Sequence, residues 1–98
     1  MKYYHVIVHT PFVGEEADVY ISAIDDHNLS CKAYNATNEN GMKWYDEEDW
    51  LERWGFDKDA DDYDAVCDEY YAQCGWRLIG MITEEEYNKL NAEGEWCI

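Results

Sequence analysis

KYYHVIVHT, residues 2–10, alternates between two sets of side chains, as a half-buried β-strand requires. The alternation sorts them into two faces, Tyr4, Val6 and Val8 opposite Tyr3, His5, Ile7 and His9. DVYISAI, residues 18–24, predicts a second strand, with Val19, Ile21 and Ala23 opposite Tyr20, Ser22 and Ile24. The link over residues 11–16 is short, so we expect the two strands to pair as an antiparallel hairpin.

Three helices are predicted after the hairpin. The first begins at Asp25 or Asp26 and reaches about Thr37, and the Asn-Gly pair at residues 40–41 is predicted to interrupt the helix. The second begins near Asp46, where four consecutive acids resemble a capping box with a negative first turn. The third runs over about 59–74, where small and aromatic residues recur at spacings of three and four.

The C-terminal part predicts one more strand and one more helix. In the strand, residues 76–82, we expect Arg77, Ile79 and Met81 opposite Trp76, Leu78 and Ile82. Thr83 followed by three glutamates is a capping box for a helix through Leu90. The order β-β-α-α-α-β-α predicts a single α+β domain over residues 1–98. Its mostly antiparallel three-stranded sheet would have the helices packed on one face.

Composition narrows the range of functions. The 98 residues include 23 Asp and Glu against 7 Lys and Arg, a net charge of -16, yet also five Trp and nine Tyr. Disordered acidic chains contain few aromatic residues, so this composition favours a folded protein. The charge excludes direct nucleic-acid binding through a basic surface and disfavours anionic membranes. No apolar run is long enough to span a bilayer. We therefore expect a cytoplasmic protein whose four cysteines stay reduced.

The acids concentrate in residues 46–69, which hold twelve acids and two bases, a net charge of -10. On the predicted third helix, four aspartates step by four, three and four and so form one row. We predict a partner-binding surface of nine acids: Glu48, Asp49, Glu52, Asp57, Asp61, Asp62, Asp64, Asp68 and Glu69. Regularly spaced carboxylates would present to a basic groove the same pattern of negative charge as the phosphates of a nucleic-acid backbone. The alternative is a solvated acidic face that serves solubility alone.

Metal binding and catalysis have weaker signals. An aspartate-rich run from Asp57 resembles an EF-hand loop but has Asp62 where glycine is needed and Asp68 where the loop needs glutamate. A structural zinc site would need several elements, for example His27 and Cys31 with Cys67 or Cys74. The alternative is that Cys67 and Cys74 are small buried core residues. No phosphate loop or nucleophile elbow is present. We expect no cofactor and no enzymatic activity, with zinc as the remaining alternative.

The chain resembles the small acidic proteins of phages and mobile elements, in four segments: residues 2–8, 44–56, 69–76 and 82–87. In size and charge it is similar to DNA-mimicking defence inhibitors, including anti-CRISPR and anti-restriction proteins. The resemblance is one of style along the whole chain and transfers no site residue. It implies a stoichiometric inhibitor in the host cytoplasm that competes with DNA or RNA for a basic CRISPR or restriction nuclease. The alternative is an acidic interaction module that binds a basic protein without mimicry.

Overall fold

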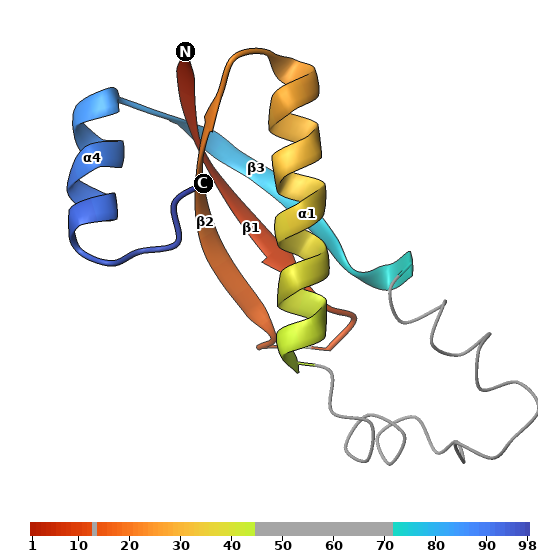
Figure 1. Ribbon diagram of the computed structural model, residues 1–98. Coiled ribbons are helices and arrows are strands. Elements are labelled where there is room, and N and C mark those ends of the chain that lie inside the picture. The colour runs from red at the N-terminus through yellow and green to blue at the C-terminus, as the bar shows by residue number, and fades with distance from the viewer. Residues whose placement is uncertain (13, 45–71) are drawn as a thin grey trace, which may run out of the picture.

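The computed structural model describes residues 1–12, 14–44 and 72–98. Its elements, drawn in Figure 1, are β1 (Lys2–His9), β2 (Glu16–Ala23), α1 (Asp26–Trp44), β3 (Gly75–Ile82) and α4 (Glu84–Ala92). The strands form one antiparallel sheet in the order β2-β1-β3. The predicted α+β class and the hairpin are thus confirmed. The second predicted helix and most of the third fall outside the described residues.

The core lies between α1 and one face of the sheet. In β1 and β2 one of the two predicted sets of side chains is buried: Tyr4, Val6 and Val8 in β1, and Val19, Ile21 and Ala23 in β2. From α1, Leu29, Ala33 and Ala36 complete the cluster. The two alanines let the helix axis come close to the strands. Burial of apolar surface, worth roughly 25 cal/mol per Å², is what holds the helix to the sheet.

α1 is longer than predicted. It runs through residues 40–41 to Trp44, so the predicted break at Asn-Gly is wrong. Both residues are buried, and Asn40 Nδ2 donates a hydrogen bond to the Glu15 carbonyl oxygen over 3.4 Å. This tertiary contact favours the helix at a point where glycine alone would cost about 1 kcal/mol.

β3 contains a register shift that the simple alternation does not foresee. Between His5 and Val6 of β1 the pairing slips, so that Gly80 lies opposite His5 and Leu78 lies opposite Val6. Ile79 is the extra residue, and an extra residue reverses the alternation beyond it. Met81 therefore shares the face of Leu78 and Ile82 shares that of Arg77. The predicted faces hold up to Leu78 and are wrong beyond it.

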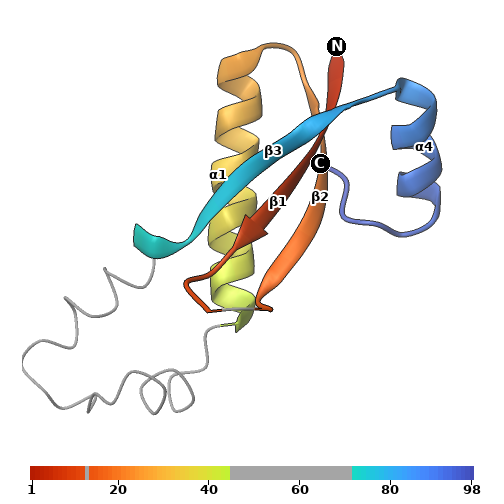
Figure 2. The same cartoon turned by 180° about the vertical axis from the view of Figure 1, so that it is seen from behind.

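α4 begins where the capping box predicts, since Thr83 Oγ1 accepts a hydrogen bond from the Glu86 amide over 3.1 Å. Its Tyr87 ring lies 4.9 Å from the ring of Tyr3, a residue of the sheet face that α1 does not cover. Figure 2 shows the sheet from the side opposite to α1, so that α1 lies behind the strands and α4 lies beside the sheet. The expectation that all helices share one face is therefore wrong for α4, because an aromatic contact ties it to the other face.

The last residues extend the sheet. The Tyr20 amide donates a hydrogen bond to the Trp96 carbonyl oxygen, and the Ser22 amide donates one to the Ile98 carbonyl oxygen, each over 2.8 Å. In return, the Ile98 amide donates to the Tyr20 carbonyl oxygen over 2.9 Å. Residues 96–98 thus lie parallel to β2 and cover its outer edge. No helix among the described residues is long and apolar enough to cross a membrane.

Candidate functional site

The predicted partner-binding acids all lie outside the described residues. This holds for Glu48, Asp49, Glu52, Asp57, Asp61, Asp62, Asp64, Asp68 and Glu69. What the structure does describe is the frame to which their segment is joined. α1 ends at Trp44, and β3 begins at Gly75, which pairs with His9 at the end of β1. Figure 1 shows both points at the end of the sheet where β1 passes into β2. We call this region, residues 9–16 with the adjoining ends of α1 and β3, the turn end.

Polar side chains are buried at the turn end. Thr10 and Glu15 are each about 5% exposed or less, and Thr10 Oγ1 donates to Glu15 Oε2 over 2.7 Å. The Thr10 amide donates to the Glu15 carbonyl oxygen over 3.1 Å, and the Phe12 amide donates to Thr10 Oγ1 over 3.2 Å. Gly14, with φ of +87°, allows the tight connection between them. Of these bonds, the one from the Thr10 hydroxyl offsets part of the desolvation of the Glu15 side chain.

Cys74 lies beside this cluster, just before β3. Burial and, to a smaller extent, the negative charge of Glu15 raise the pKa of its thiol to about 11. The thiol therefore stays protonated at neutral pH, whereas nucleophilic and metal-binding cysteines act as thiolates. The His9 ring covers the neighbouring Gly75, where an added Cβ would lie 3.0 Å from Nε2. The arrangement favours packing over chemistry at Cys74.

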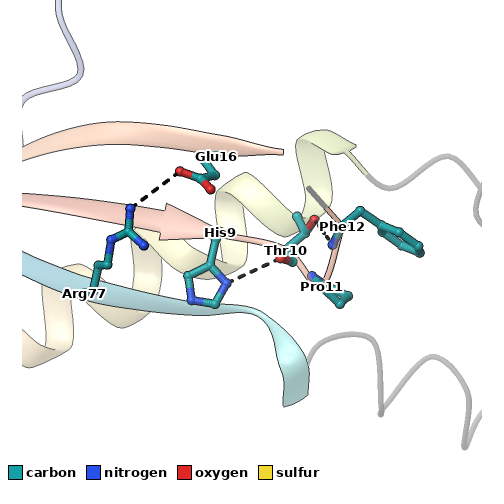
Figure 3. Close-up of a pocket in the computed structure, with 6 residues that line it drawn as sticks. All are labelled: His9, Thr10, Pro11, Phe12, Glu16 and Arg77. Carbon is teal, nitrogen blue, oxygen red and sulfur yellow. Dashed lines mark hydrogen bonds and ion pairs between the residues drawn. The ribbon is translucent and has the colours of Figure 1, made fainter. Parts of the chain in front are cut away.

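A shallow pocket of about 240 Å³ opens on the surface of the turn end. Figure 3 shows its lining: His9, Thr10, Pro11, Phe12, Glu16 and Arg77. Arg77 Nη2 lies 3.9 Å from Glu16 Oε2, and both side chains are about half exposed or more, so this ion pair contributes little to stability. Sequence reasoning missed this pocket, because it depends on the pairing of β1 with β3. Its one sequence signal is a lone arginine in an otherwise uncharged strand.

A second polar cluster occupies the sheet face that α1 leaves uncovered. His5 Nε2 lies 2.8 Å from Asp18 Oδ1, and the His5 ring stacks on that of Tyr20 with centroids 4.9 Å apart. Burial and the charge of Asp18 raise the pKa of the Tyr20 hydroxyl. The alternation places His5 and Tyr20 in the sets of side chains opposite those that the structure buries. The strand register is what brings them together with Asp18.

The candidate zinc ligands do not gather. His27 and Cys31 are neighbours on the exposed side of α1, with Sγ 3.5 Å from Nε2. Cys74 is at the turn end, whereas His27 and Cys31 lie in the first turns of α1, which begins near the other end of β1. The predicted set with Cys74 is therefore wrong, and Cys67 lies outside the described residues. In residues 1–12, 14–44 and 72–98, no group of three His, Cys, Asp or Glu is placed to hold a metal ion.

Comparison with protein-family models finds no matching family, and searches of curated proteins and of solved structures return no match. Function is therefore inferred from the residues of this chain and from their arrangement.

Proposed function

We propose that the protein is a stoichiometric inhibitor of a nucleic-acid-binding defence nuclease, of CRISPR or restriction type. Its acidic segment, residues 46–69, would occupy a basic channel and compete there with DNA or RNA. The observation that carries the proposal is the concentration of charge, twelve acids against two bases between Trp44 and Gly75.

The fold supports this proposal through the attachment of that segment. α1 is held to the sheet by buried apolar residues, and β3 is paired along β1, so both flanking elements belong to a packed frame. Both reach the turn end, where the Asn40 to Glu15 hydrogen bond joins α1 to the β1–β2 connection. The acidic segment is thereby joined at both ends to one pole of a small platform, which limits the chain entropy lost on binding.

The charge of the platform itself is milder. Outside residues 45–71 the chain has eleven acids and five bases. Among the described residues, Glu16 lies 3.9 Å from Arg77 and Asp18 lies 2.8 Å from His5. The molecule is therefore electrically asymmetric, with -10 of its -16 in one segment. A field of this kind steers a basic partner toward the acidic pole and makes association fast and dependent on salt.

A second candidate function, an acidic interaction module without mimicry, is favoured by the apolar surface of β3. Three large apolar residues of this strand, Leu78, Ile79 and Met81, are 50%, 50% and 62% exposed. Exposed apolar patches of this kind mark protein interfaces. Such a module would bind its partner through β3. A variant that no longer competes with nucleic acid would then still bind the partner.

The test is a charge-neutralised variant compared with a control of equal net charge. We expect the quadruple substitution of Asp57, Asp61, Asp64 and Asp68 to Asn to weaken inhibition at least about tenfold, since several charge contacts are lost together. The readout is plasmid interference by a panel of CRISPR and restriction systems, followed by DNA competition with the nuclease that responds.

The control variant replaces Glu84, Glu85, Glu93 and Glu95 with Gln, four exposed acids on and after α4. It changes the net charge equally but far from the turn end, and it should inhibit as the parent does. Equal loss in both variants would indicate a bulk charge effect. Full inhibition by the aspartate variant at low salt would refute the predicted acidic docking surface. If Leu78→Ser and Met81→Ser abolished inhibition in that case, the result would favour the interaction module.

A further inference from the structure

The start of α1 presents a histidine and a cysteine as a matched pair. His27 and Cys31 are four residues apart, so they stack one turn above the other on the same side of the helix. Both are exposed, and neither contributes to the buried cluster of the core. Their Sγ and Nε2 atoms lie 3.5 Å apart, close enough for a thiol to donate a hydrogen bond to the ring.

The same separation fits a tetrahedral zinc ion. Zn–S bonds of about 2.3 Å and Zn–N bonds of about 2.0–2.1 Å, meeting at the tetrahedral angle, place sulfur and nitrogen about 3.5 Å apart. The separation of the two atoms in the structure therefore equals that of two ligands on one zinc ion. Soft thiolate and borderline imidazole ligands select zinc over magnesium or calcium.

We propose that His27 and Cys31 form half of a Zn²⁺ site, and that the same pair of a second copy supplies the other half. Closed structural zinc sites have four protein ligands. The part of the chain that is placed offers no third His, Cys, Asp or Glu beside the pair. A two-fold axis through the metal gives two histidines and two cysteines from one isologous contact.

The surroundings of the pair allow a second helix to approach. Tyr34, three residues after Cys31 on the same side of α1, is 64% exposed, and Ile24 just before the helix is 71% exposed. These two residues add exposed apolar surface before and after the pair along the chain. When zinc binds, each Cys31 thiol releases its proton to solvent as the Zn–S bond forms, so two thiolates balance the charge of the ion.

The experiment uses the full chain, reduced and freed of metal, at a salt concentration of 0.15 M that screens repulsion between copies. Zinc chloride is titrated while the mass in solution is followed by analytical ultracentrifugation. We expect a shift from monomer to dimer that is complete at about half an equivalent of zinc per chain. Cobalt(II) in place of zinc should give the absorption of a tetrahedral thiolate complex.

Substitutions at the pair provide the controls. His27→Ala and Cys31→Ser should each abolish the dimer while the circular dichroism spectrum is unchanged, because both side chains are exposed. Cys97→Ser and Cys67→Ser should leave metal uptake intact. The proposal is overturned by no uptake, by one equivalent bound without dimerisation, by uptake that survives Cys31→Ser, or by loss of uptake in Cys67→Ser.

Discussion

At the scale of single residues, the turn end is unusual because its buried groups are polar. Thr10, Glu15 and Asn40 lie inside the molecule, and each makes at least one hydrogen bond there. A buried polar group that loses its partner costs about 1–3 kcal/mol, so these residues constrain one another. The connection from β1 to β2 and the last turns of α1 are therefore held by directional contacts as well as by packing.

Cys74 gives a direct readout of this environment. With a pKa near 11, about one thiol in a thousand is ionised at pH 8, compared with about one in ten for a cysteine of ordinary pKa near 9. We expect maleimide labelling of Cys74 in the folded protein to be about 100-fold slower than in urea, as measured by peptide mass spectrometry. Labelling of Cys31, which is exposed, should be fast in both.

Glu15→Gln provides the check on cause. Removing that charge should lower the pKa of Cys74 partway, because burial, the larger cause, remains. The folded state holds the thiol proton more tightly than the unfolded state does. The resulting stability is complete below pH 9 and is lost as the pH rises through about 11. Equal labelling rates in folded and unfolded protein would contradict the burial of this thiol.

At the scale of elements, β3 has two glycines in different surroundings. An added Cβ on Gly75 would meet His9 Nε2 at 3.0 Å, whereas one on Gly80 would have no heavy atom within 4 Å. Glycine within a strand costs about 0.5–1 kcal/mol relative to alanine. The two positions are therefore expected to respond in opposite ways to the same substitution.

We predict that Gly80→Ala raises the free energy of unfolding by about 0.5 kcal/mol and that Gly75→Ala lowers it by about 1 kcal/mol. Urea denaturation of the two variants measures both values. His9→Ala should remove the penalty at Gly75, since the clash is with that ring, so the double variant completes a mutant cycle. Destabilisation at Gly75 that persists without the His9 ring would place the cause in the backbone instead.

At the scale of the whole molecule, charge opposes folding. A net charge of -16 on 98 residues means that many like charges are brought together when the chain becomes compact. Each such pair within a helix costs a few tenths of a kcal/mol. The hydrophobic cluster between α1 and the sheet, together with the strand pairing, must exceed this repulsion.

Screening should therefore stabilise the protein. Raising NaCl from 0.02 M to 0.5 M shortens the Debye length severalfold, and we expect a gain of about 1 kcal/mol, or about 4–8 °C in Tm. Thermal unfolding followed by circular dichroism measures this shift. The Asp57, Asp61, Asp64 and Asp68 to Asn variant should show a smaller rise. A Tm that falls with added salt would mean that net attraction, rather than repulsion, dominates the surface.

Local pattern was sufficient for much of this fold. The alternation in β1 and β2 predicted which residues share a face, and the Thr83 capping box predicted where α4 begins. Strand alternation and helix capping each involve only a few neighbouring residues, so they can be recognised without knowledge of the rest of the chain. The acidic segment is visible in the same way, since charge is a property of composition and needs no tertiary contact.

Other features depended on contacts between residues distant in sequence. The continuation of α1 through Gly41 goes with the bond from Asn40 to Glu15, and the reversed faces of β3 follow from its slipped register against β1. The pocket at Arg77 and the His5–Asp18 pair likewise exist only because particular strands pair. Periodicity determines which residues share a side of an element, but the free energy that selects register, helix length and neighbours arises only when the elements pack.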